Sequence, residues 1–185
     1  VRACFHCEPF HAVSASEMPS AGGSHTVLLR NDGRVVACGV GAVGVDDVAE
    51  PGAGRLYVEA SAGDKHTILL RSDGQVVGCG RNMRGQCQFP ELEPGLAYSR
   101  VSAGGSHSVL LRSDGRALAC GDNMYGQCDI PELRPDVRYS QISAGEMHTA
   151  LLTSDGRAVA CGRNDEGQCD LPEPKGGAVY SQVSA

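Results

Sequence analysis

The chain has 185 residues, of which 41% are hydrophobic but only 4% aromatic, with no Trp and a net charge of −6. This length fits one domain or somewhat more, and this composition builds a core from small and aliphatic side chains. An acidic chain lacks the basic face that nucleic-acid backbones require, and apolar runs such as residues 109–111 are far too short to cross a bilayer. We therefore expect neither a nucleic-acid partner nor a membrane span.

Residues 1–19 form an N-terminal segment that we expect to be a degenerate repeat or a cap. Cys4 and Cys7 have the two-residue gap of a zinc knuckle, with His6 and His11 nearby, but no second Cys or His pair lies at finger spacing. Zinc is the minor interpretation, and we predict no metal site. The N-terminus has no apolar stretch of signal-peptide length, and because the sequence stops partway into a repeat we expect a piece of a longer protein.

From residue 20 onward, one unit recurs four times with a constant spacing of 41 residues. The marker residues are His25, His66, His107 and His148, with Cys38, Cys79, Cys120 and Cys161 and the Asp-Gly pairs that begin at Asp32, Asp73, Asp114 and Asp155. A period between about 20 and 50 residues is typical of solenoids and propellers. The expected repeats span approximately residues 20–60, 61–101, 102–142 and 143–183, followed by the start of a further repeat.

The third copy shows most clearly which strands the unit should contain. Residues 98–103 alternate polar and apolar side chains, and residues 107–112 have the Val and Leu content of a buried strand. Asp114-Gly115 then predicts a tight hairpin with a primed turn, followed by a third strand over residues 116–121. No helical apolar spacing occurs in the unit, so the prediction is an all-β repeat with three to four antiparallel strands.

A turn-rich loop follows the third strand. Gly121, Asn123 and Gly126 can adopt turn conformations that are closed to most residues, so this loop should fold back on itself. A Pro-rich connector over residues 131–135 comes next. Because Pro cannot donate to a β-ladder, we expect the connectors to cross the surface between units.

The repeated motifs resemble those of a known family. Ala-Gly-Gly-x-His-Ser/Thr, then Leu-x-x-Asp-Gly, then x-Gly-x-Asn-x-x-Gly-Gln is similar to the repeat of the regulator of chromosome condensation family, over roughly residues 20–185. The resemblance implies a β-propeller or partial propeller, with four blades plus the opening strand of a fifth. The family usually has Trp where this chain has Cys79, Cys120 and Cys161, and Leu-Gly at the pairs that begin at Cys87, Cys128 and Cys169.

The number of copies bears on how such an array would close. The family commonly has seven blades, and seven units of this size would need about 290 residues. Four copies therefore need further sequence, a second chain in a dimer, or docking into a larger complex to cover their ends. Without such a cover, unpaired strand edges would promote aggregation.

The nine cysteines allow two interpretations. In the first, disulfides join Cys79 to Cys87, Cys120 to Cys128 and Cys161 to Cys169. Cys38 would then pair with Cys4 or Cys7, and one cysteine would remain unpaired. Pairing between neighbouring units is a rival that leaves more sulfurs unpaired. In the second interpretation the cysteines are buried thiols, and we weigh the two about equally. Disulfides would imply an oxidising compartment; the localisation is otherwise unknown.

We expect no catalytic residues and no cofactor. A histidine that recurs in every unit is more simply a structural residue bonded to backbone in its own blade, whereas a catalytic site needs different residues in different places. The copies contain no Ser, His and acid set, no paired carboxylate site and no phosphate-binding Gly-Lys motif.

The positions that vary between copies suggest where a protein partner would bind. They lie in the fold-back loops and are Arg81, Met83, Arg84, Asp122, Met124, Tyr125 and Arg163. Arg and Tyr are enriched at protein interfaces, so we predict a non-catalytic interaction scaffold that binds a protein of unknown identity through these loops. An ordinary solvated loop is the alternative interpretation of the same residues. The alternative functions are a structural accessory subunit of a larger complex and, as the resemblance implies, a small-GTPase regulator.

Overall fold

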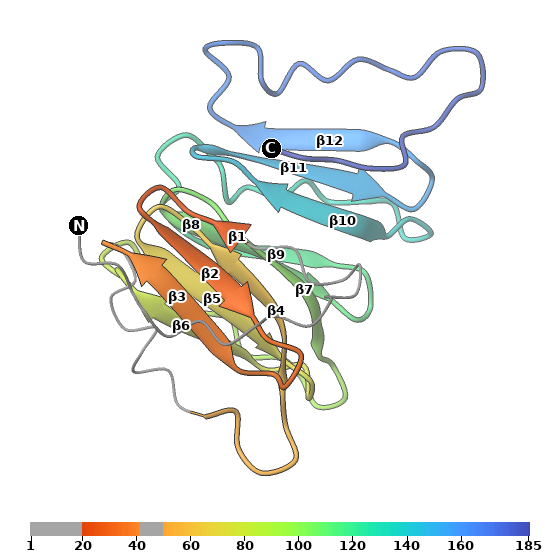
Figure 1. Cartoon of the computed structure of the whole chain (residues 1–185). Coiled ribbons are helices and arrows are strands. Elements are labelled where there is room, and N and C mark those ends of the chain that lie inside the picture. The colour runs from red at the N-terminus through yellow and green to blue at the C-terminus, as the bar shows by residue number, and fades with distance from the viewer. Residues whose placement is uncertain (1–19, 41–49) are drawn as a thin grey trace.

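The computed structural model describes residues 20–40 and 50–185, which form strands and no helices (Figure 1). The strands are β1 (Ser20–Ala21), β2 (His25–Leu29), β3 (Val35–Gly39), β4 (Tyr57–Ala62), β5 (His66–Arg71), β6 (Val76–Gly80), β7 (Tyr98–Ala103), β8 (His107–Arg112), β9 (Ala117–Gly121), β10 (Tyr139–Ala144), β11 (His148–Thr153) and β12 (Ala158–Gly162). Cys4, Cys7 and the first fold-back loop lie outside the described residues. No helix in the described ranges is long and apolar enough to cross a membrane.

The strands form four antiparallel sheets, each of three strands in sequence order: β1-β2-β3, β4-β5-β6, β7-β8-β9 and β10-β11-β12. The strand positions agree with those expected from the third copy. Consecutive sheets pack face to face, so that the first and the last sheet lie at the two ends of the array (Figure 1). The all-β prediction is therefore confirmed, with three strands per sheet.

The middle strand of each inner sheet is apolar because both of its faces are covered. Side chains alternate across a strand, so Leu69 faces one neighbouring sheet and Ile68 faces the other. Leu69 packs in a cluster with Val27 of the first sheet, whereas Ile68 packs with Leu110 of the third. Leu69, Ile68 and Leu110 are 0% exposed. Burying one such side chain contributes about 2 kcal/mol, so the core consists of the interfaces between sheets.

The hairpin between the second and third strands is tight, but its turn is not of the primed type that the sequence predicts. Gly115 has φ +80° and its N–H donates to Arg112 O at 3.0 Å, while no residue other than Gly has positive φ among those described. A primed two-residue turn of the Asn-Gly or Asp-Gly kind would need positive φ at Asp114 as well. Asp114 instead accepts a hydrogen bond from the Arg116 N–H at 3.1 Å. Gly115 O then accepts from the Tyr139 N–H at 2.8 Å, which ties the turn to the next sheet.

Serine side chains connect the first strands of successive sheets. Ser20, Ser61, Ser102 and Ser143 accept hydrogen bonds from the backbone N–H of Ala62, Ala103, Ala144 and Ala185 at 2.8, 2.9, 2.9 and 2.8 Å. The last of these bonds places residues 180–185 where the first strand of a further sheet would lie. The array is thus a four-bladed partial propeller whose blades are joined by the same bond.

Candidate functional site

A ladder of histidines crosses the interfaces between the sheets. Nε2 of His25, His66 and His107 lies 2.8, 3.0 and 2.9 Å from the hydroxyl oxygens of Thr67, Ser108 and Thr149. Each partner belongs to the middle strand of the next sheet, where it directly follows that sheet's own histidine. The histidines are therefore structural, as the sequence predicts. The sequence predicts a backbone partner, however, whereas the partner in the structure is a hydroxyl of the neighbouring blade.

The hydroxyl partners fix which nitrogen of each ring carries the proton. Ser108 donates its hydroxyl hydrogen to Gln86 O at 2.7 Å, so its oxygen accepts from Nε2–H of His66. Thr149 donates in the same way to Gln127 O at 2.8 Å and accepts from His107. The buried Nδ1 atoms of these rings have no hydrogen-bond partner among the described residues. Both rings are consequently neutral, with the proton on Nε2.

Burial keeps these rings neutral well below ordinary pH. It lowers the pKa of His66 to about 4, and the neighbouring His25 adds to this effect. Burial lowers the pKa of His107 to about 4 as well, with His66 and His148 adding to it. A buried neutral imidazole that already donates to a hydroxyl is a packing element, not a proton-transfer group at neutral pH.

The fold-back loops form a frame that projects other side chains outward. In the third copy Gln127 is 1% exposed, and its Oε1 accepts from the Tyr125 N–H at 2.9 Å. Asn123 Oδ1 accepts from the Cys128 N–H at 2.8 Å. The second and fourth copies repeat both bonds. Because the frame satisfies the loop backbone internally, the intervening side chains are left at the surface.

The structure brings most of the predicted partner-binding residues together. Arg84 Nη2 lies 3.8 Å from Met124 Sδ, and its Nε lies 4.0 Å from Asp122 Oδ1. The guanidinium of Arg163 stands 5.8 Å from the centre of the Tyr125 ring. Loops of the second, third and fourth copies therefore form one surface, called here the loop surface. It consists of Arg81, Met83, Arg84, Asp122, Met124, Tyr125 and Arg163, of which Arg81 and Met83 are exposed in the same loop as Arg84.

Met147 is a neighbour of this surface that the sequence reasoning missed. Its Sδ lies 3.9 Å from Arg163 Nη1. The only signal in the sequence was its position, because Met147 stands where the other copies have Ser24, Lys65 and Ser106.

The described cysteines are free thiols, so the disulfide interpretation is wrong for them. They are Cys38, Cys79, Cys87, Cys120, Cys128, Cys161 and Cys169. The thiols of the fold-back loops point at backbone carbonyls instead of at each other. Cys128 donates to Asp122 O at 3.3 Å, and Cys120 lies 3.7 Å from Gln86 O of the preceding loop. The Asn123 side chain holds the Cys128 N–H, which aims its sulfur back into its own loop.

The described thiols should differ strongly in reactivity. Burial raises the pKa of Cys120 to about 12, whereas Cys38 is exposed. Because the thiolate is the nucleophile, we expect iodoacetamide at neutral pH to alkylate Cys38 at least about tenfold faster than Cys120. Peptide mass spectrometry over time measures the two rates, and labelling in denaturant should equalise them. Equal rates in the folded protein would contradict the partly buried position of Cys120.

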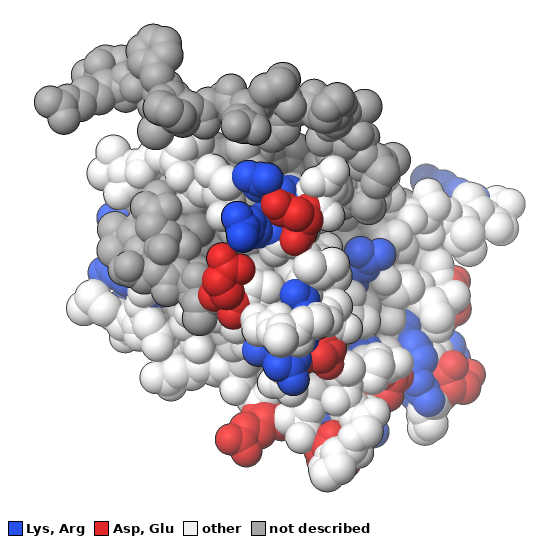
Figure 2. All heavy atoms as spheres, turned by 60° about the horizontal axis from the view of Figure 1, so that its bottom comes forward, with Lys and Arg blue, Asp and Glu red and all other residues white. Residues whose placement is uncertain are grey.

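The described residues contain no group of three or more His, Cys, Asp or Glu side chains that could hold a metal ion. Figure 2 shows one face of the molecule, on which acidic and basic side chains are interspersed and not gathered into one broad field. The side chains of the loop surface carry thioether, aromatic, guanidinium and carboxylate groups.

Comparisons with known proteins place the fold. Residues 20–44, 57–86, 98–127 and 139–168 match the family described as Regulator of chromosome condensation (RCC1) repeat. No curated protein matches the sequence. Human WBSCR16 is similar in structure, with a TM-score of 0.67 and 19% identity over 95% of this chain and 53% of that chain. The CRINKLY WD40 ectodomain of the Arabidopsis thaliana receptor kinase ACR4 has a TM-score of 0.62 and 22% identity over 82% of this chain and 57% of that chain.

Prp20p from Saccharomyces cerevisiae, whose structure was described with its binding to Gsp1p and histones, is also similar. Its TM-score is 0.54, with 18% identity over 88% of this chain and 61% of that chain. The chain therefore spans between 53% and 61% of the length of these three structures. At such low identity the likeness concerns the fold alone. Since the four matched segments cover more than half of the sequence and each contains one three-stranded sheet, the chain belongs to the regulator of chromosome condensation repeat family.

Proposed function

We propose that this partial propeller is a non-catalytic protein-interaction module that binds a protein partner through the loop surface. One observation carries the proposal: large apolar side chains are held in solvent by a well-bonded loop frame. Met83, Met124 and Tyr125 are 78%, 71% and 47% exposed. Exposing such side chains together is unfavourable unless a partner covers them, and clustered exposed apolar residues mark interaction sites.

The composition of the surface also indicates which kind of partner would fit. Met is adaptable in shape, and Tyr and Arg are the residues that most often dominate binding energy. Among the described residues Arg84 has one acidic neighbour, Asp122, at a long 4.0 Å, so much of its charge is available to a partner. A protein surface that offers an apolar ridge beside a carboxylate would complement these groups.

The non-catalytic part of the proposal rests on where the titratable residues lie. His66 and His107 are buried and engaged between sheets, and the thiols of the fold-back loops donate to backbone. A catalytic group needs access to a substrate, which the two buried histidines do not offer. Docking of the open array into a larger complex, or its closure by a second chain, stays a prediction.

The loop surface can be tested with a paired variant. We expect Arg84→Ala with Tyr125→Ala to reduce the partner proteins captured from a cell extract by at least about tenfold, because truncating two central anchors typically costs this much. Quantitative mass spectrometry of the captured proteins measures the change against the unmodified chain.

The matched control removes comparable surface at the opposite end of the sheets. Arg55 pairs with Asp73 of the β5–β6 hairpin, and Val58 is 49% exposed. Arg55→Ala with Val58→Ala should leave capture unchanged. Equal capture by the loop-surface variant and this control would overturn the proposed function.

A further inference from the structure

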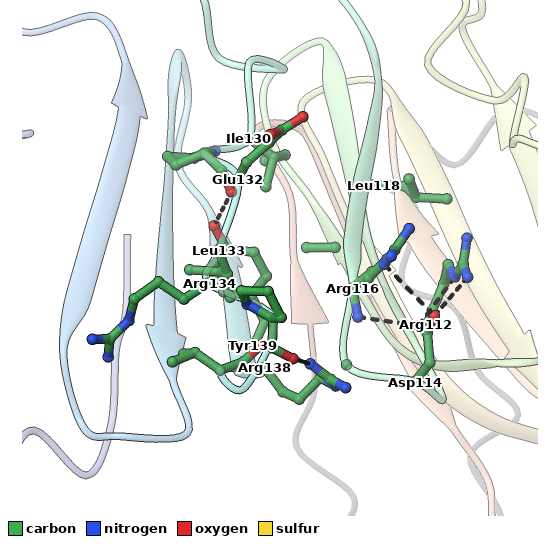
Figure 3. Close-up of a pocket in the computed structure, with 15 residues that line it drawn as sticks. Arg112, Asp114, Arg116, Leu118, Ile130, Glu132, Leu133, Arg134, Arg138 and Tyr139 are labelled. Carbon is green, nitrogen blue, oxygen red and sulfur yellow. Dashed lines mark hydrogen bonds and ion pairs between the residues drawn. The ribbon is translucent and has the colours of Figure 1, made fainter.

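A cavity of about 510 Å³ opens at the hairpin end of the third sheet (Figure 3). One wall is β9 with the hairpin before it, and the other is the connector that leads to β10. Tyr139 fixes the connector, since its hydroxyl donates to Pro131 O at 2.6 Å. No residue of the loop surface lines this cavity, so it is a separate candidate site.

The cavity combines an apolar floor with a basic rim. Ile130 and Leu133 supply the floor, together with the buried Val137 and Tyr139. The charged lining residues are Arg112, Arg116, Arg134, Arg138, Asp114 and Glu132. Four arginines stand against two carboxylates here, whereas the whole chain carries a net charge of −6. The local excess of positive charge would attract an anionic group.

Two of the arginines are already committed to carboxylates of the chain. Arg112 Nη2 lies 2.6 Å from Asp114 Oδ2, and Arg134 Nη2 lies 3.3 Å from Asp155 Oδ2. These pairs hold their side chains in place and neutralise them in part. They leave Arg116 and Arg138 as the groups that can take a ligand.

Arg116 and Arg138 retain most of their charge for a ligand. Arg116 is 77% exposed, and its one ion pair in the described ranges is a shared one with Asp114, at 4.0 Å. Arg138 donates to two neutral carbonyls, Pro135 O at 2.6 Å and Val137 O at 3.1 Å, and forms no ion pair within residues 20–40 and 50–185. Those carbonyl bonds direct its guanidinium along the connector, at the rim of the cavity (Figure 3).

The other copies show that the fold does not need this charge. The second copy has Gln75, Glu93 and Ala97 where the third has Arg116, Arg134 and Arg138. The position of Arg138 is Leu56 in the first copy and Val179 in the fourth. All four copies build the same sheet, so an arginine at this position is an addition to one blade.

We infer that this cavity binds an acidic peptide segment of a partner protein, with a carboxylate between Arg138 and Arg116 and an adjacent apolar side chain on the Ile130 and Leu133 floor. The fork of a guanidinium matches a carboxylate in two hydrogen bonds. The volume lies within the range of ordinary ligand pockets, and it accommodates one or two side chains rather than a folded domain. This site is independent of the proposed loop surface.

The test uses a short acidic peptide and its neutral isostere on the full chain. Acetyl-Leu-Glu-Leu amide should shift the Nε–Hε NMR signals of Arg116 and Arg138 in a saturable titration. Acetyl-Leu-Gln-Leu amide should bind at least about tenfold more weakly, because a charge-assisted pair is replaced by a neutral one. Equal affinity for the two peptides would overturn the inference.

Residues from the second copy provide matched variants. Arg116→Gln with Arg138→Ala installs the residues of that copy, which are compatible with the fold. This variant should bind the acidic peptide at least about tenfold more weakly than the unmodified chain. The reverse transplant, Gln75→Arg with Ala97→Arg, should create a second binding event. Displacement of the peptide by an equal concentration of inorganic phosphate would identify a phosphate site and overturn the peptide assignment. Capture through the loop surface should be unaffected by Arg116→Gln with Arg138→Ala, so the two proposals fail separately.

Discussion

We expect His66 and His107 together to lower the free energy of unfolding by about 4 kcal/mol when the pH falls from about 7 to about 5. Burial lowers the pKa of each ring from its ordinary value of 6.5 to about 4 in the folded protein. Between these two values the unfolded chain binds protons that the folded chain does not. Acid therefore favours unfolding across this window, and the loss levels off below a pH of about 4.

Other groups act on stability in the same region and have to be separated from the histidines. The Arg71 guanidinium holds the pKa of Asp73 at about 2, so the pairing of Asp73 is lost only at pH values below the window. Burial raises the pKa of Glu59, which makes the folded state take up a proton earlier and opposes the effect of the histidines. A comparison of variants isolates the contribution of the two rings.

Urea unfolding at about pH 7, 6 and 5 measures the effect, with the double variant His66→Gln and His107→Gln as its control. Gln keeps an N–H donor for Ser108 and Thr149 but does not titrate. The variant should therefore have a lower free energy of unfolding at neutral pH, and that free energy should lose most of its dependence on pH. NMR signals of the two rings should stay at their neutral positions at a pH of about 5.5. Two results would contradict the buried neutral state: titration of either ring near its ordinary pKa, or a free energy of unfolding that changes with pH in the variant as it does in the unmodified chain.

The repeat period was enough to predict the sheets, because each strand is a local pattern. The Val and Leu run of β8 predicts a strand and Asp114-Gly115 predicts a turn from local sequence alone. Recurrence of both patterns every 41 residues strengthens the prediction. The turn type was wrong because φ at Asp114 depends on how the hairpin hydrogen bonds close, which the dipeptide alone does not determine.

Contacts between copies were harder to predict. Every ladder histidine is followed by Thr or Ser, as in His66-Thr67 and His107-Ser108, yet only the stacking of sheets shows that the hydroxyl serves the preceding blade. A spacing of eight residues brings Cys120 and Cys128 into one loop without specifying where their sulfurs point. The sequence does not predict the arginine-rimmed cavity, because the cavity forms where a connector folds against β9 and that contact has no sequence signature.

A close approach between the third and fourth sheets depends on Gly104, and its replacement should have the other large effect. A Cβ atom at Gly104 would lie 2.5 Å from Gly145 O and 2.6 Å from His107 Nδ1, and it would also meet His107 Cε1. The carbonyl belongs to backbone of the next sheet, so it cannot move aside as a flexible side chain would. The strain is purely steric, since Gly104 does not have positive φ.

We expect Gly104→Ala to lower the free energy of unfolding by about 3 kcal/mol, measured by urea unfolding at neutral pH. The neighbouring change Ser106→Lys is the control and should stay within about 0.5 kcal/mol, because Lys65 occupies that position in the second copy. If the added methyl pushes the His107 ring away from Thr149, the ring gains access to water and the pH dependence of stability should diminish in the same variant. Full stability of Gly104→Ala would mean that the sheets can separate without cost, and that the ladder does not set their spacing.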